Sequence, residues 1–148
     1  KLVDTDSVHL RTMPGIPSNW ANPALADKWT KVFAVRRVIT SALEPLRREK
    51  TIGSSLQAAP TVHLSKEMHS AVSGVNFTEV AIVSGADVRA GDGPAHAFRV
   101  EDIPGVAVEP TLAAGEKCQR CWQVLPDVAH HVDRICQRCD TAVSTGRS

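Results

Sequence analysis

Four cysteines restrict the possible folds of this chain more than any other feature. Cys118 and Cys121 form one C-x2-C pair, Cys136 and Cys139 form a second, and the 148-residue sequence contains no other cysteine. Each pair places two sulfurs at one tight turn, so two facing turns offer four thiolates at the corners of a tetrahedron, which Zn²⁺ prefers at structural sites. Such a closed site has no open position for a substrate. We therefore predict one structural zinc ion that holds the C-terminal stretch together and does no chemistry.

Two other uses of the same cysteines remain open at this level. Lys1–Asp4 lead into polar sequence and not into an apolar run, so no signal peptide is predicted and a reducing, cytoplasmic location is expected. That location disfavours two disulfides. An iron–sulfur or rubredoxin-like iron site uses the same ligand set, and the spacing alone does not distinguish it from zinc.

Length and composition exclude several classes of protein. The chain suffices for one ordinary domain or two small ones, and 43% hydrophobic residues allow a packed core. Its longest apolar runs are far short of a membrane span, so no membrane partner is expected. It has no tyrosine and only three Trp and three Phe, which disfavours an RNA platform of many stacked aromatics. Because the sequence has no initiator Met, we expect it to be a fragment of a longer protein.

The small net charge of +1 conceals an uneven distribution. Residues 23–51 carry seven Lys/Arg against three Asp/Glu, residues 52–116 carry three against eight, and residues 117–148 carry five against three. Two basic blocks therefore flank an acidic middle. This pattern suits contact with a polyanion at both ends, although a solvated helix face explains the first block equally well.

The first basic block reads as an amphipathic helix. After a looped lead-in over residues 1–22, Asn22 is a good N-cap and Pro23 a good first helical residue. Pro45 is expected to kink or split the helix. Its apolar seam, with alternating spacings of four and three, comprises Leu25, Trp29, Val32, Ile39, Leu43 and Leu46, and Arg36 occupies the missing seam position.

The middle of the chain reads as a small α+β unit that begins after Pro60. Ser54 caps a short turn before it, and Ser65 caps a helix over Lys66–Val72. Strands are expected over Thr61–Leu64, Glu79–Val83, Ala95–Val100 and Val106–Val108, with Ala86–Arg89 either continuing the second or pairing back on it.

Several basic and aromatic side chains are candidates for RNA contact. Arg37 and Arg48 are eleven residues apart, about three helical turns, and share a face away from the apolar seam. Trp122 either packs against the zinc site or offers a stacking surface for a base. The Lys and Arg side chains beside the cysteines either contact phosphate or compensate the negative charge of four thiolates. The full candidate set is Arg36, Arg37, Arg48, Lys117, Arg120, Trp122 and Arg138.

The order of these motifs resembles one protein family. Lys117–Trp122 followed by Cys136–Cys139 resembles the C-terminal zinc finger of bacterial isoleucyl-tRNA synthetases, a finger type shared with formamidopyrimidine-DNA glycosylases. The resemblance extends along nearly the whole chain and is vaguest over 61–113. The other segments that resemble the family are Asp6–Leu10 with Met13-Pro14, Ala34–Val38, Ala42–Glu44, Arg47–Lys50 and, most specific of all, Ile52–Ala58.

The resemblance implies an enzyme as the parent protein. Such a parent is a class I synthetase, an isoleucine–tRNA ligase that uses ATP and Mg²⁺ and has a separate editing domain. The His-Ile-Gly-His-like and Lys-Met-Ser-Lys-Ser-like signatures are absent here, so this portion is expected to be non-catalytic. The resemblance implies that it binds the anticodon arm of isoleucine tRNA and that the parent enzyme is a monomer. The alternative is a zinc-finger module of another protein, such as a glycosylase-type nucleic-acid-binding finger or a protein adaptor.

The fold expected from these observations is α+β. Residues 1–59 would be the end of a helical anticodon-binding domain, contributing an N-terminal amphipathic helix. Residues 60–113 would form a small mixed α/β junction unit, and residues 114–148 the four-cysteine zinc finger.

Overall fold

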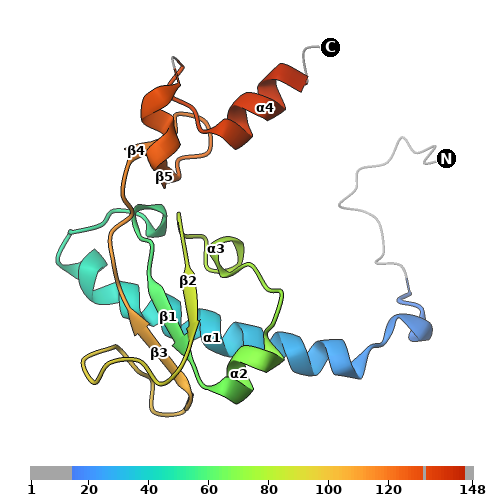
Figure 1. The fold of residues 1–148 in the computed structure, drawn as a ribbon. Helices are drawn as coiled ribbons and strands as arrows, with labels where there is room; N and C mark the ends of the chain where they lie inside the picture. Colours follow the sequence, from blue (N-terminus) through green and yellow to red (C-terminus); the bar gives the residue numbers. More distant parts are fainter. Residues whose placement is uncertain (1–14, 132, 146–148) are drawn as a thin grey trace.

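The structure has a larger α+β body and a small C-terminal lobe (Figure 1). It is a computed structural model in which residues 15–131 and 133–145 are described. The motif Asp6–Leu10 with Met13-Pro14 lies outside the described residues. The elements of the body are η2 (Ser18–Trp20), α1 (Pro23–Arg48), η3 (Ser55–Gln57), β1 (Thr61–Leu64), α2 (Lys66–Ala71), α3 (Phe77–Val80), β2 (Asp87–Ala90) and β3 (Val106–Glu109). The predicted α+β class is confirmed.

A three-stranded sheet in the order β2-β1-β3 forms the centre of the body. β1 pairs in parallel with β2, with Val62 opposite Val88, and antiparallel with β3, with Val62 opposite Val108. The parallel pairing requires a crossover, and α2 and α3 lie within that crossover. The sheet therefore places β1 at its centre, with α1 along one face (Figure 1).

The part of α1 from Val32 onward packs against the sheet and contributes to the core. One cluster of buried side chains unites Val32, Val35, Ile39 and Leu43 of the helix with the sheet residues Val62, Leu64, Val106 and Val108. This cluster crosses the expected boundary at residues 59/60. The helix and the junction unit thus share one core.

The predicted start of α1 is confirmed. The side chain of Asn22 accepts a hydrogen bond from the N–H of Leu25 at 3.0 Å, which satisfies one of the free donors of the first turn. The helix continues through Pro45 to Arg48. The N-terminal part of the predicted seam is not buried, because Leu25 and Trp29 are 49% and 39% exposed.

The expected strand over Glu79–Val83 is wrong. Asn76 caps the short helix α3, and the chain then turns sharply at Ile82, whose φ is +56°. Phe77, Ala81 and Val83 are buried at spacings that suit this helix and turn. A short apolar run does not distinguish strand from helix by itself, and the N-cap decides for the helix.

The expected strand over Ala95–Val100 is reduced to one bridge between Phe98 and Val108. The guanidinium of Arg99 donates hydrogen bonds to the carbonyls of residues 92–95 and 97, including 2.8 Å bonds to Asp92 and Ala97. A backbone whose carbonyls converge on one cation cannot also extend as a strand.

The strands predicted at Thr61–Leu64 and Val106–Val108 are confirmed, and Ala86–Arg89 forms most of β2, paired with β1.

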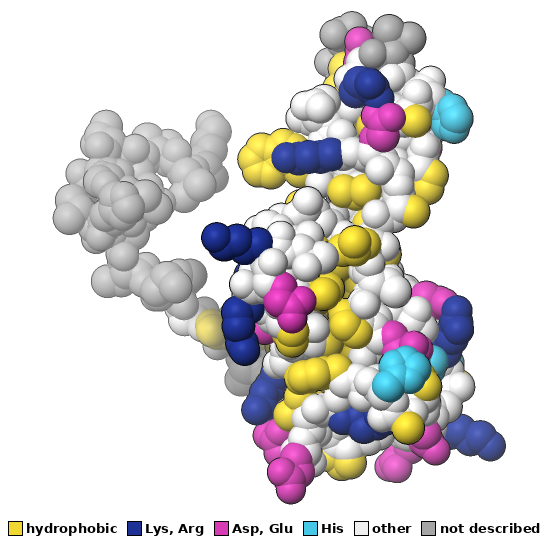
Figure 2. Space-filling view, turned by 90° about the vertical axis from the view of Figure 1, so that its left-hand side faces the viewer, with side chains coloured by type: hydrophobic (Ala, Val, Ile, Leu, Met, Phe, Trp, Pro, Cys, Tyr) yellow, Lys and Arg dark blue, Asp and Glu magenta, His cyan; other side chains and the backbone are white. Residues whose placement is uncertain are grey.

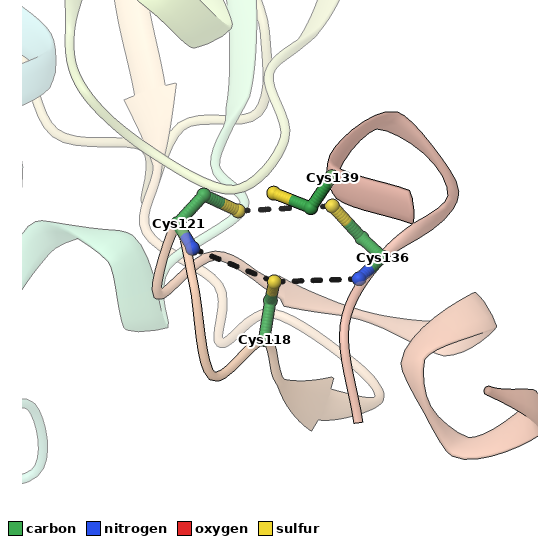
Figure 3. A group of neighbouring side chains, drawn as sticks. All are labelled: Cys118, Cys121, Cys136 and Cys139. Atoms are coloured by element: carbon green, nitrogen blue, oxygen red, sulfur yellow. Dashed lines mark hydrogen bonds between the residues drawn. The ribbon is translucent and has the colours of Figure 1, made fainter. Parts of the chain in front are cut away.

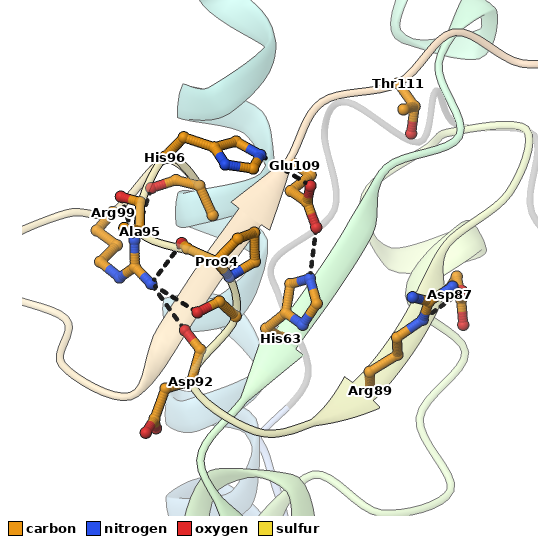
Figure 4. A network of polar contacts seen from close by, with 12 residues as sticks. His63, Asp87, Arg89, Asp92, Pro94, Ala95, His96, Arg99, Glu109 and Thr111 are labelled. Atoms are coloured by element: carbon orange, nitrogen blue, oxygen red, sulfur yellow. Dashed lines mark hydrogen bonds and ion pairs between the residues drawn. The ribbon is translucent and has the colours of Figure 1, made fainter.

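A polar network covers the sheet face turned away from α1 (Figure 4). His63 Nε2 lies 2.7 Å from Glu109 Oε1, and His96 Nε2 lies 3.1 Å from Glu109 Oε2. The hydrogen bond with His63 is the main cause of a lowered pKa at Glu109; burial opposes the shift and His96 adds to it. Glu109 therefore ties the loop after β2 to the sheet.

Within the described ranges, no helix combines the length and the apolar character that crossing a bilayer requires.

We predict that Glu109→Gln reduces the acid sensitivity of the body. Because the pKa of Glu109 is below 4.5 in the folded chain, its stabilising contribution is complete above about pH 4.5 and is lost as pH falls through the folded pKa. The stability difference between parent and variant should be fully present just above about pH 4.5 and should shrink as the pH falls below that value. Urea unfolding at several pH values measures it.

The control for this experiment is Glu101→Gln, which removes an exposed carboxylate that has no ion pair among the described residues. A constant difference between parent and Glu109→Gln across this pH range would contradict the assignment.

Candidate zinc centre and nucleic-acid interface

The C-terminal lobe is a finger built around a two-stranded hairpin. Its elements are β4 (Glu116–Lys117), β5 (Val124–Leu125), η4 (Pro126–His130) and α4 (Gln137–Thr145). Gly115 precedes β4 with φ +111°, and a Cβ there would lie 2.3 Å from the backbone of Leu125. Only glycine permits this close approach of the two strands.

The four cysteine side chains converge between the β4–β5 turn and the start of α4 (Figure 3). Their sulfurs all lie within 4.8 Å of one another, and Cys121 Sγ is 3.7 Å from Cys136 Sγ. A tetrahedron with Zn–S bonds of about 2.3 Å has S···S edges of about 3.8 Å, whereas a disulfide bond is about 2.0 Å long. The geometry fits one tetrahedral metal ion and not two disulfides.

Backbone donors prepare Cys118 to act as a thiolate. Burial alone would raise the pKa of this thiol, but N–H groups of Cys121, Cys136 and Arg120 lower the pKa to about 6. Two of these bonds, from the N–H groups of Cys121 at 3.5 Å and Cys136 at 3.3 Å, are drawn in Figure 3. Such N–H···S bonds stabilise the charged sulfur that metals bind.

The other two shifted thiols behave in the opposite way. Burial raises the pKa of Cys136 to about 12, with further contributions from the neighbouring thiols, and burial also raises the pKa of Cys121. Four sulfurs this close together, three of them buried, cannot all carry negative charge without a cation. The four sulfurs can therefore all be thiolates only when a metal ion is bound. Binding of the ion also contributes free energy of folding to the finger.

The finger has almost no hydrophobic core of its own. Apart from three of the cysteines, Val128 is its only buried side chain among the described residues, with Leu125 and Ile135 packed against this cluster. Such a small apolar cluster is insufficient to fold a lobe of this size without a staple. The metal is thus structural, as predicted.

The cations beside the finger are divided between two roles. Arg120 Nη1 lies 3.8 Å from Cys139 Sγ, so it compensates the charge of a ligand. Arg134 forms an ion pair with Glu116. Arg138 is exposed and has no ion pair among the residues that the structure covers, and it remains a predicted RNA contact.

Trp122 does not pack as a substitute core, which corrects that expectation. Its side chain is 61% exposed, its φ is +68°, and Lys117 Nζ lies 5.3 Å from its ring centroid. Trp122 ends the turn that begins at Cys118, with its N–H donating to the carbonyl of Cys118 at 3.0 Å, and its side chain faces solvent. The exposed ring with a cation beside it leaves the stacking surface as the better interpretation.

The arginines of α1 are partly engaged with the body. Arg36 Nε donates to the carbonyl of Val80 at 2.9 Å, which explains a cation at a seam position. Arg37 pairs with Asp102 at 2.9 Å, with both side chains about 60% exposed, and such an exposed pair is weak and exchangeable. Arg48 is exposed at the end of the helix.

Hydrogen bonds join the finger to the body. Ser84 Oγ accepts from the N–H of Val124 at 2.8 Å and donates to the carbonyl of Leu56. Gln123 Nε2 donates to the carbonyl of Val83 at 3.4 Å, and the same side chain lies 3.7 Å from Cys121 Sγ. Sequence reasoning missed this joint, because Ser84 has no recognisable motif. Figure 2 shows the finger as a separate lobe above the body, with hydrophobic side chains along the junction.

Comparison with known proteins supports the zinc finger and the family resemblance. Residues 115–142 match the family described as "Zinc finger found in FPG and IleRS". The chain is 48% identical over 126 residues to the isoleucine–tRNA ligase of Agrobacterium fabrum, covering 84% of this chain and 13% of the relative. It is 47% identical over 139 residues to that of Ruegeria pomeroyi, covering 93% and 14%. The corresponding enzyme of Caulobacter vibrioides is 48% identical over 122 residues, covering 82% and 12%.

The fold and the cysteine cluster thus define an α+β region that carries a structural zinc finger of this family. Over most of its length, that region corresponds in sequence to the C-terminal region of bacterial isoleucine–tRNA ligases. It spans only about an eighth of the length of these relatives. The expected resemblance is confirmed.

We predict that removing the metal unfolds the finger and spares the body. The finger core consists mainly of ligands, whereas the core of the body contains no finger residue, and structural zinc contributes on the order of 10 kcal/mol in such units. A strong chelator should broaden or shift the amide resonances of residues 115–145 while those of β1–β3 persist. Native mass spectrometry should find one zinc per chain.

The matched variant is Cys136→Ser, which should show the chelated spectrum without chelator. Disulfides in mass spectra of the non-reduced chain, or unfolding of the whole chain on chelation, would contradict this account.

Proposed function

We propose that this chain is the tRNA-binding C-terminal portion of an isoleucine–tRNA ligase. The parent enzyme joins isoleucine to its tRNA with ATP and Mg²⁺, which act in a part of the parent outside this sequence, and this portion alone is non-catalytic. The partners are the anticodon arm of isoleucine tRNA and the rest of the parent chain, in a cytoplasmic monomer. The identity of 47–48% along most of the chain supports the parent.

One observation carries the role in RNA binding: the exposed Trp122 on a left-handed backbone, with Lys117 beside its ring. An indole presented to solvent next to a cation matches how proteins hold single-stranded bases and their phosphates. Arg138 extends the positive surface along the finger, whereas Arg120 lies against Cys139 Sγ and would act on RNA through the charge of the zinc site. The zinc ion, held by Cys118, Cys121, Cys136 and Cys139, fixes the turn that presents the indole.

The helix α1 provides the second contact in this proposal. Arg37 and Arg48 lie on one face and would bind phosphates of the anticodon arm, Arg37 by exchanging its exposed pair with Asp102. Arg36 serves mainly to hold Val80, so it would act on RNA through the position of the helix. The finger (114–148), the junction unit (60–113) and the end of the helical domain (1–59) then contribute to one RNA surface.

We predict that Trp122→Gly weakens tRNA binding while the finger remains folded. Glycine suits φ +68° better than tryptophan, so the zinc content should stay at one. Loss of a stacking side chain should cost about 1–3 kcal/mol, more for cognate than for non-cognate tRNA. Fluorescence anisotropy with the full-length parent measures the affinities. Unchanged affinity with intact zinc would remove Trp122 from the interface.

A separate prediction concerns Arg37→Ala combined with Arg48→Ala. These variants should weaken cognate and non-cognate tRNA about equally and lower the salt slope of log K by about one for each lost phosphate contact. The control is Arg47→Ala, whose side chain pairs with Glu44 on the same helix. An unaltered salt slope would show that this helix face is only solvated.

A further inference from the structure

Ile82 occupies a backbone position that normally belongs to glycine. The N–H of Ile82 donates to the carbonyl of Glu79 at 3.2 Å, and the N–H of Val83 donates to the carbonyl of Thr78 at 3.0 Å. This pair of bonds is the Schellman ending of a helix, here α3, with Ile82 as the left-handed residue at φ +56°. A β-branched residue in this conformation is a true outlier.

The strain at Ile82 is not offset by good burial. Its side chain is 56% exposed, whereas the residues on either side of it, Ala81 and Val83, are buried. Folding alone would favour glycine here, because glycine adopts this conformation without steric cost. Strained residues that survive without burial tend to mark sites of contact with other molecules.

The exposed side chain of Ile82 lines a groove between the body and the finger. The groove has a volume of about 260 Å³, and its walls include Leu56, Thr78 and Ile82 from the body and Cys121, Gln123 and Arg138 from the finger. The Ser84 and Gln123 hydrogen bonds described above fix the two walls relative to each other. The groove is therefore preformed, and its finger wall includes Cys121 and Gln123, the two sequence neighbours of Trp122.

We propose that this groove receives one unpaired base of the bound RNA, with Ile82 against the face of the base. The inference rests on the proposed tRNA-binding function and extends it to residues of the junction unit. Trp122 and Ile82 then hold RNA from the finger and from the body, respectively.

Size and chemistry favour a base as the occupant. Pockets for drug-sized ligands are roughly 300–1,000 Å³, so this smaller groove suits a single ring system. Leu56 and Ile82 provide apolar contact, while Thr78 and Gln123 offer hydrogen-bonding groups for a base edge. Glu79 also lines the groove, and its carboxylate repels phosphate but can accept from a base amino group. Arg138 at the finger wall suits the phosphate that stays outside.

The test is Ile82→Gly in the full-length parent, because glycine separates the two roles of this residue. It relieves the left-handed backbone, so the thermal stability of the chain should be unchanged or higher. It removes the proposed contact, so affinity for cognate tRNA should fall about five- to tenfold. The salt slope should stay constant, since no phosphate contact is lost, whereas Arg138→Ala should lower that slope by about one.

Two variants serve as matched controls. Leu112→Ser removes an apolar side chain of similar exposure, 55%, outside the groove, and should leave tRNA affinity unchanged. Lys50→Gly relieves the strain at the left-handed residue after α1, whose φ is +59°. Its effect on thermal stability shows how large a gain to expect from Ile82→Gly. Ile82→Val should retain most of the affinity.

The outcomes distinguish this inference from the proposed function. If Trp122→Gly weakens binding and Ile82→Gly does not, the groove assignment is overturned and the RNA-binding role stands. If neither variant alters affinity, both are overturned. If Ile82→Gly leaves RNA affinity intact but increases proteolysis of the parent at this junction, the occupant of the groove is a polypeptide segment and the assignment of a base to the groove is wrong.

Discussion

The metal-binding cluster is the constraint on which the outer half of this structure depends. Among the described residues of the finger, three of its cysteines and Val128 are buried, so most of the core consists of the ligands themselves. With the ion in place, the turn after Cys121 is fixed, and with it the direction of Trp122. Without it, burial keeps the pKa of Cys121 and Cys136 raised and favours their neutral thiols, and backbone donors stabilise the charged sulfur at Cys118 alone. Packing and electrostatics therefore require the same cation.

Local signals predicted those parts of the fold in which one residue determines the outcome. Asn22 and Ser65 cap helices, and the alternation in Thr61–Leu64 produces a central strand, as read from the sequence. Prediction failed where a helix cap was overlooked or where a distant group decides. The run Glu79–Val83 has a strand-like composition, but Asn76 caps a helix there, and Arg36 of α1 donates to the carbonyl of Val80, the last residue of that helix. Residues 95–100 do not form a strand, because the carbonyls of Ala95 and Ala97 accept hydrogen bonds from the Arg99 guanidinium.

The candidate site shows the same division. The cysteine spacing was enough to predict the metal site, because four thiols in two turns have few alternatives. The orientation of Trp122 depends on a backbone angle that sequence does not display, and the junction depends on Ser84, a small residue without a motif. Charge counting also overestimated the free cations, since Arg36 and Arg120 have partners within the structure.

The hydrogen bond between Val124 and Ser84 has a consequence for the order of assembly. Its two residues are 40 positions apart, and Ser84 is itself anchored on Leu56, so the finger docks on a surface that earlier residues must already have built. During synthesis the body precedes the finger out of the ribosome and can fold first. Zinc capture then closes the finger against a finished support. Delayed metal supply would leave a folded body with an open joint, an intermediate that cellular proteases can recognise by its unprotected hairpin.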